Sequence, residues 1–139
     1  MAKKILIMGL PGSGKTSLAK LLAPMFNAVL INEDEVRKEA NDFDLSEVGR
    51  SIHTNRMKRL ADEAIQNNRN VIADFDCSKE HAGEDLNADY IIWMDTIKES
   101  KLEPPKNFDF KVTHKDAQMF SFLIKQEILD KLKGLGPHD

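Results

Sequence analysis

The segment Gly9–Thr16, GLPGSGKT, has the residue types and spacing of a phosphate-binding loop, G-x-x-x-x-G-K-[ST]. Its glycines let the backbone wrap closely around a phosphate with the N–H groups turned inward. A lysine at this place supplies positive charge to the β- and γ-phosphates, and the following hydroxyl can bind Mg²⁺. The pattern therefore predicts binding of Mg²⁺ and ATP. The expected phosphate-binding residues are Gly9, Pro11, Gly12, Ser13, Gly14, Lys15, Thr16 and Ser17.

A carboxylate and an arginine stand three residues apart in INEDEVR, at Asp34 and Arg37. This spacing puts both on one face of the first turn of a helix that follows a short strand. In an open α/β sheet, the carboxyl ends of the strands form the ligand crevice. We expect Asp34 to act with Lys15 as a catalytic residue, either holding a Mg²⁺-bound water or taking a hydroxyl proton, and Arg37 to bind an anionic acceptor. The alternative is a helix-capping Asp34 in an exposed ion pair.

A second carboxylate, Asp74, lies near the end of the apolar run NVIADF. A carboxylate beside a phosphate loop commonly orders the metal and its water shell. The expected metal site is therefore Thr16 with Asp74. A structural role for Asp74 at the end of the strand is the alternative.

The helix expected to begin at Ser46 changes character along one face. Its second half places apolar residues on that face, namely Met57, Leu60, Ala61, Ala64 and Ile65. The same face carries Arg50, His53 and Thr54 in the first half, so we expect Arg50 and His53 to project over the crevice and bind the acceptor. The alternative is a helix end in water, which is how we interpret Arg56, Lys58 and Arg59.

Strands and helices alternate along the chain and predict the scaffold for these residues. Apolar runs indicate strands at 3–8, 28–31, 70–75, 89–94 and 108–113, and apolar periodicity indicates helices at 15–26, 32–40, 46–68 and 116–132. The last helix is expected to bury Phe120, Leu123, Ile124 and Ile128. We predict one domain over residues 1–139, a three-layer α/β phosphate-loop NTPase fold with a mostly parallel sheet of about five strands and helices on both faces.

Composition restricts the class of protein further. The chain has 139 residues, a formal charge of −3 and 41% hydrophobic residues. A near-neutral charge makes a nucleic-acid wrapper an unlikely function. The apolar runs fall well short of the roughly 20 residues that a membrane span requires. One cysteine and no evident export signal predict a cytoplasmic protein.

With these motifs in place, the chain resembles a short form of adenylylsulfate kinase from Lys3 to Asp95. The resemblance rests on GLPGSGKTSLA, NEDEVR, NDFDLSEVGR with Arg56 beyond it, ADFDCS and PPKNFDFKVTHKDA. It implies transfer of the ATP γ-phosphoryl group to the 3′-hydroxyl of adenylylsulfate, a step of sulfate assimilation. It also implies that Asp34 is the metal or base carboxylate and that Arg37 and Arg50 bind the acceptor. Family members are often dimers, so a homodimer is one expectation.

The sequence departs from this family at several positions. Asn32 and Glu33 replace the first two residues of its D-G-D motif, and Leu45 replaces a substrate-stacking Phe. Other replacements are Gly49 for Asp, His53 for a substrate-binding Asn, and Cys77 for Ser. Only fourteen residues separate Asp95 from Phe110, where the family has a helix and a basic lid. The cations of this reduced lid are Lys98, Lys101 and Lys106.

Two other functions are compatible with the same residues. A polynucleotide or other 5′-hydroxyl kinase would also use a strand-end Asp and Arg, and would need a basic track for its substrate. A non-catalytic ATP-binding regulatory protein would account for the reduced lid. The Asp34 carboxylate on the acceptor side favours an enzyme over a regulatory protein, since pure nucleotide binding does not require it.

Overall fold

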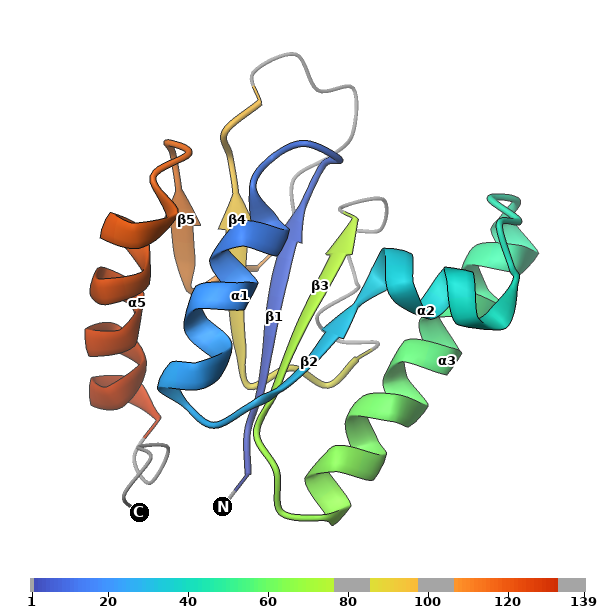
Figure 1. Cartoon of the computed structure of the whole chain (residues 1–139), viewed down its shortest axis with the longest axis horizontal. Helices are drawn as coiled ribbons and strands as arrows, with labels where there is room; N and C mark the ends of the chain where they lie inside the picture. The colour runs from blue at the N-terminus through green and yellow to red at the C-terminus, as the bar shows by residue number, and fades with distance from the viewer. Residues whose placement is uncertain (1, 77–85, 98–106, 133–139) are drawn as a thin grey trace.

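The structure is a computed structural model that describes residues 2–76, 86–97 and 107–132. These residues form a five-stranded sheet in which every pairing is parallel (Figure 1). The strand order is β2-β3-β1-β4-β5. The bounds are β1 Lys4–Gly9, β2 Val29–Asn32, β3 Val71–Asp76, β4 Tyr90–Met94 and β5 Phe110–Val112.

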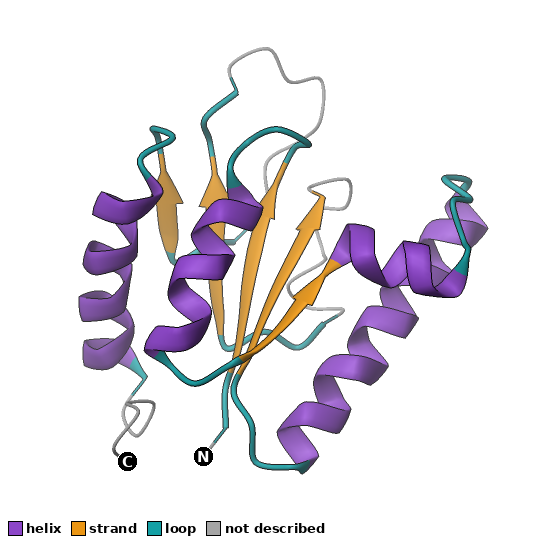
Figure 2. Ribbon diagram, viewed as in Figure 1, coloured by secondary structure: helices purple, strands orange, loops and turns teal. Residues whose placement is uncertain are grey.

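Helices cover the two faces of this sheet (Figure 2). Their bounds are α1 Lys15–Met25, α2 Glu33–Ala40, α3 Glu47–Gln66 and α5 Ala117–Lys131. Helices α1 and α5 pack together over one face, and α2 and α3 contribute to the core on the other. The predicted three-layer α/β fold is confirmed. The element ends differ from the predicted ones by a few residues at most.

Strand β1 divides the core into two clusters, because successive side chains of a strand point to opposite faces. Ile5 and Ile7 face α1 and α5, whereas Leu6 and Met8 face α2 and α3. All four side chains are at most 1% exposed. A strand buried on both faces requires an uninterrupted apolar sequence, which is why KILIM is readable as a central strand.

Two leucines on the predicted apolar faces are more exposed than expected. Leu60 and Leu123 are 39% and 51% exposed. Each leucine stands beside the buried stripe of its helix, and the sheet covers only the centre of that stripe. The predicted burial of Phe120, Ile124 and Ile128 is confirmed.

Side-chain caps begin the helices that approach the predicted crevice. The side chain of Asn32 accepts a hydrogen bond from the N–H of Glu35 at the start of α2. Ser46 does the same for Gly49 at the start of α3. Asn41 ends α2 with a positive φ of 50°, a conformation that asparagine tolerates better than most residues. These polar residues therefore fix the path of the chain between β2 and α3.

The helices in the described part of the chain are not membrane spans. None of them is both long enough and apolar enough to cross a bilayer.

Candidate active site

The glycine loop leaves β1 at the carboxyl edge of the sheet and leads directly into α1 (Figure 1). Gly12 and Gly14 have φ values of +82° and +96°, a region that residues with a Cβ rarely adopt. Gly9 is required for a different reason, because a Cβ there would lie 2.5 Å from Ser13 Oγ and 2.8 Å from Met94 Cβ. The loop thus has the backbone geometry that the motif predicts.

One hydrogen bond within this loop and another from the segment after β4 hold the loop in place. The N–H of Ser13 donates to the Leu10 carbonyl at 3.0 Å. Thr96 Oγ1, just beyond β4, donates to the Ser13 carbonyl at 2.7 Å. Lys15 begins α1, is 8% exposed, and has its Nζ atom 3.4 Å from the Leu10 carbonyl. The positive end of the α1 dipole and the Lys15 ammonium therefore lie at the same loop, an arrangement that favours an anion.

Asp74 and Asn32 occupy matching positions on neighbouring strands β3 and β2. Asn32 Nδ2 donates to Asp74 Oδ1 at 3.0 Å and to Oδ2 at 2.8 Å, and the N–H of Glu33 donates to Oδ1 at 3.2 Å. Asn32 Nδ2 also lies 3.4 Å from Thr16 Oγ1. The amide of Asn32 thus joins the Asp74 carboxylate to the hydroxyl at the start of α1.

The pKa of Asp74 is raised above its ordinary value of 3.8, mainly because the side chain is buried and only 1% exposed. Hydrogen bonds from Asn32 and the Glu33 backbone oppose this shift. The positive charge of Lys15 also lowers the pKa of Asp74, and the negative charge of Asp34 raises it. These three charged groups therefore lie within electrostatic reach of one another.

The residues at this position fit Mg²⁺. Thr16 and Asp74 offer a hydroxyl and a carboxylate, which are the oxygen donors that Mg²⁺ prefers. Within the described ranges there is no group of three or more His, Cys, Asp or Glu side chains arranged for a metal. Mg²⁺ commonly binds through one or two protein oxygens together with substrate phosphates, so this small donor set suits a metal that arrives with ATP.

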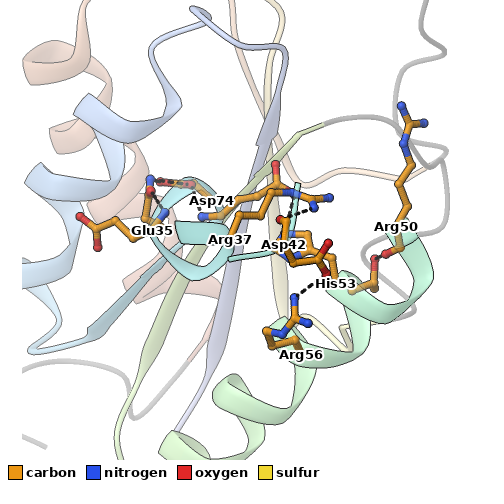
Figure 3. A network of polar contacts seen from close by, with 10 residues as sticks. Glu35, Arg37, Asp42, Arg50, His53, Arg56 and Asp74 are labelled. Carbon is orange, nitrogen blue, oxygen red and sulfur yellow. Dashed lines mark hydrogen bonds and ion pairs between the residues drawn. The ribbon is translucent and has the colours of Figure 1, made fainter. Parts of the chain in front are cut away.

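Asp34 and Arg37 differ in their surroundings although they are three residues apart on α2. Asp34 is exposed, whereas Arg37 is 9% exposed and donates from Nη1 to the Asp42 carbonyl at 3.1 Å. Asp42 in turn accepts from Arg56 Nη1 on α3 at 3.2 Å (Figure 3). Arg37 and Arg56 therefore join α2 to α3 through Asp42. The ion pair between Arg56 and the Asp42 carboxylate differs from the expectation that Arg56 is only solvated.

His53 is fully buried, at 0% exposure, contrary to the expectation that it projects over the crevice. Its Nε2 atom lies 3.0 Å from Glu33 Oε2, and its ring stacks on Phe75 at 5.8 Å with an interplanar angle of 13°. Thr54, expected beside it over the crevice, is also buried, at 4%. The turn of α3 that carries these residues packs against the end of β3, so it cannot stay open as a polar face.

Sequence reasoning missed Glu33 and treated Asn32 only as a helix-capping residue and a departure from the D-G-D motif. Glu33 is 4% exposed, supports Asp74 through its backbone N–H, and contacts His53 through its side chain. A glutamate in the first turn of a helix ordinarily serves the helix dipole in water. A signal for burial was nonetheless present, since the residue directly follows an apolar strand on the ligand side of the sheet.

Arg50 lies on the open side of this region. Its side chain extends away from Arg37, Asp42 and Arg56 (Figure 3). Exposed apolar side chains occur in the same stretch of chain, namely Phe43 at 62%, Leu45 at 63%, Val48 at 69% and Ile52 at 51%. The structure therefore brings Asp74, Asp34 and Lys15 within electrostatic reach of one another. Arg50 lies apart from them, in a stretch of chain whose apolar side chains are exposed.

A small cavity of about 130 Å³ adjoins the glycine loop on the side of β4 and β5. Residues from the start of α1, the ends of both strands and the start of α5 line it, and these are Gly14, Ser17, Leu18, Met94, Val112, His114, Lys115 and Ala117. Cys77 and the predicted lid cations Lys98, Lys101 and Lys106 lie outside the described residues.

Fold and loop together define an α/β protein of the phosphate-loop kinase type. The family model AAA_33, described as an AAA domain, matches residues 5–86, which is more than half of the chain. The chain therefore belongs to this family.

Two curated relatives match part of the chain. It is 39% identical over 79 residues to replication factor C subunit 1 of Arabidopsis thaliana, covering 55% of this chain and 8% of that protein. It is 32% identical over 64 residues to a shikimate kinase of Thermodesulfovibrio yellowstonii, covering 46% of this chain and 37% of that protein. The matched regions thus span well under half of either relative.

The similar solved structures cover a larger share of this chain than the curated relatives do. The crystal structure of APE1195 has a TM-score of 0.79 at 17% identity and covers 93% of this chain and 96% of that one. The structure of Mycobacterium tuberculosis APS kinase in complex with AMPPNP and APS has a TM-score of 0.73 at 19% identity, covering 96% and 98%. At these identities the likeness establishes the fold.

Proposed function

We propose that this protein is a small-molecule kinase that uses Mg²⁺ and ATP and transfers the γ-phosphoryl group to an alcohol. One observation carries the proposal. The buried Asp74 carboxylate is joined through Asn32 to the Thr16 hydroxyl, directly beside a glycine loop with two positive φ angles. A protein that only held phosphate would not need a desolvated carboxylate there, since an isolated buried negative charge opposes anion binding. With a cation present, the same carboxylate becomes favourable.

Each residue of the site has a separate task in this proposal. The loop N–H groups, the start of α1 and the Lys15 ammonium hold the phosphates and offset the charge that develops during transfer. Thr16 and Asp74 would hold Mg²⁺, which when bound neutralises phosphate oxygens and orients the transferred group. Asp34, exposed at the start of α2, accepts the proton of the acceptor hydroxyl as it attacks. The cavity beside Gly14 and Ser17 takes the nucleoside part of ATP.

We propose further that the acceptor is adenylylsulfate, bound on the side of α2 and α3. Arg50 supplies a guanidinium for an anionic group, and the exposed Phe43 and Leu45 give an apolar surface for a base. Arg37 contributes from α2, and its bond to the Asp42 carbonyl leaves other guanidinium N–H groups to donate. In the described conformation the His53 side chain contacts Glu33, whose backbone N–H donates to Asp74. The proposed contact of His53 with the acceptor requires α3 to move.

The polynucleotide alternative needs a continuous basic surface along α3. The basic residues of α3 that could form this surface are Arg50, Arg56, Lys58 and Arg59. Two of them form ion pairs within the protein. Arg56 contacts Asp42 and Lys58 contacts Asp62, at 3.2 and 2.8 Å. These pairs leave Arg50 and Arg59 for a nucleic-acid strand, a smaller charge than such a substrate favours. This observation supports the small-molecule acceptor over the oligonucleotide.

The test is an assay of ADP release with Mg²⁺ and ATP, run in parallel with adenylylsulfate, shikimate and a 5′-hydroxyl oligonucleotide. Lys15→Met should abolish turnover, whereas Lys20→Met should not, because Lys20 is an exposed lysine farther along the same helix. Turnover with another alcohol would sustain the kinase and reject adenylylsulfate. ATP binding with no turnover on any acceptor would favour the regulatory alternative.

A further inference from the structure

A second concavity lies on the opposite edge of the sheet from β5. It has a volume of about 440 Å³ and runs between strand β2 and helices α2 and α3. Its floor is apolar, formed by Val29, Ile31, Val36, Leu60 and Ala64. No residue of the glycine loop lines it. This groove, which we call the β2 groove, also explains the exposure of Leu60, whose side chain faces it.

The open edge of β2 forms one side of the groove. Strand β2 pairs only with β3 among the described strands. The N–H of Val29 donates toward β3, to the Asn70 carbonyl at 2.7 Å. Because backbone groups of consecutive strand residues point in opposite directions, the N–H and C=O of Leu30 point away from β3, into the groove. An extended segment lying there can therefore pair with Leu30.

The rim of the groove is acidic. Glu35, Glu39 and Glu63 line it and are exposed, and Arg69 is the lining residue of opposite charge. A rim with three carboxylates and one guanidinium attracts a cation. A second copy of this chain related by a two-fold axis would bring the same carboxylates against one another, which charge repulsion opposes.

We propose that the β2 groove binds an extended segment of a partner protein in which apolar and basic residues alternate. The segment adds a strand at Leu30, places its apolar side chains on the floor, and directs its Lys or Arg side chains to Glu35, Glu39 and Glu63. Because β2 has only four residues, backbone pairing is short. We expect a dissociation constant on the order of tens of micromolar. The proposal goes beyond the kinase function and does not depend on it.

The experiment uses the full chain and a blocked seven-residue peptide of alternating valine and lysine. Binding is followed by fluorescence anisotropy and by the backbone amide resonances of the protein. The parent peptide should shift the Leu30 amide. Peptides with every second amide N-methylated, made in both registers, report on strand pairing, and one register should lose binding. A Val/Glu peptide should not bind.

Two protein variants test the rim with matched charge changes. Glu63→Lys and Asp130→Lys each change the charge by +2 near the end of a helix, where a lysine is tolerated. Glu63→Lys should weaken peptide binding about fivefold or more, and Asp130→Lys should not. The proposal is overturned if the Leu30 amide resonance does not shift at millimolar peptide, or if the two N-methylated peptides bind equally well. It is also overturned if Glu63→Lys and Asp130→Lys change peptide binding equally. Self-association of the protein that Glu63→Lys abolishes would show that the groove binds a second copy of the chain instead.

Discussion

The side-chain amide of Asn32 serves two elements at once, since its nitrogen donates to both carboxylate oxygens of Asp74 and its oxygen accepts from the N–H of Glu35. One residue therefore caps α2 and holds the buried carboxylate beside the glycine loop. The position of α2, which carries Asp34, is tied in this way to the proposed metal site.

Asn32→Asp separates these two tasks. An aspartate keeps the cap, because its carboxylate still accepts from Glu35, but it places a second negative charge against Asp74. Two adjacent buried carboxylates resist joint ionisation, so the variant should lose about 1–3 kcal/mol of unfolding free energy at pH 7. The loss should shrink as the pH falls and one carboxyl takes up a proton. Urea unfolding between pH 5 and 8, with Asn32→Ser as the uncharged control, measures the effect. An equal loss at every pH would contradict it.

Asp74→Asn should stabilise the ligand-free protein while removing its response to Mg²⁺ and ATP. Burial raises the pKa of Asp74, so its charged form is less favourable in the folded than in the unfolded chain. The unfavourable contribution is present at neutral pH and disappears as the pH falls through the raised pKa. An amide oxygen in the place of Oδ1 retains one bond from Asn32 and the bond from Glu33, whereas the amide nitrogen in the place of Oδ2 cannot accept the second bond from Asn32. Melting curves at pH 7 should show an equal or higher midpoint without ligand.

The same curves with Mg²⁺ and ATP complete this test. Saturating ligand stabilises a protein by about 2.7 kcal/mol at one hundred times the dissociation constant, and Asp74→Asn should lose most of that gain. A lower midpoint without ligand would show that the carboxylate serves the fold rather than the metal.

The fold was predictable because each strand and helix carries its own local signal. The KILIM run, the glycines that follow it, and the caps at Asn32 and Ser46 together specify strand, loop and helix in order. The proximity of Asp74 to the loop followed from the rule that strand ends meet at one edge of a parallel sheet. The partners of each polar residue could not be predicted in this way, since they depend on packing between segments distant in sequence. Glu33 and His53 are the clearest case. The local sequence around either residue does not indicate that their side chains form a buried contact across twenty residues.

His53→Phe tests that pair. The variant retains a ring to stack on Phe75 but removes the nitrogen that contacts Glu33, and should cost about 1–3 kcal/mol of stability. A double-mutant cycle with Glu33→Gln should give a coupling above about 0.5 kcal/mol. Kinetics with the acceptor supply a second measurement. A higher KM for the acceptor with unchanged stability would instead place His53 in contact with the substrate.

Gly49 is held in place by the turn that precedes α3. A Cβ at this position would lie 2.4 Å from Asp44 Cγ and 2.5 Å from the Asp44 carbonyl oxygen. In an open helix, Gly→Ala gains up to about 1 kcal/mol, but here the overlap should reverse the sign and cost about 1–3 kcal/mol. Gly49→Asp, the residue of the adenylylsulfate kinase pattern, should cost at least as much. Unfolding of Gly49→Ala beside Val48→Ala, at an exposed neighbour, measures the difference, and equal stabilities would show that the turn adjusts freely.

Lys4 and Asp62 join the start of β1 to α3, and their ion pair gives a pH-dependent contribution to stability. Lys4 is 7% exposed, and Asp62 also accepts from Lys58 at 2.8 Å. The hydrogen bond from Lys4 is the main reason that the pKa of Asp62 lies below its ordinary value. A lowered pKa stabilises the folded protein above the unfolded value of about 3.9, and this contribution is lost as the pH falls through the lowered pKa.

Asp62→Asn should therefore be less stable than the parent at pH 7, by about 1–3 kcal/mol, since it leaves a buried ammonium without its counter-charge. The two proteins should converge in acid. Lys58→Met, which removes only the exposed pair, should stay within about 0.5 kcal/mol of the parent, and a comparable loss in both variants would mean that the buried Lys4 contact contributes nothing specific.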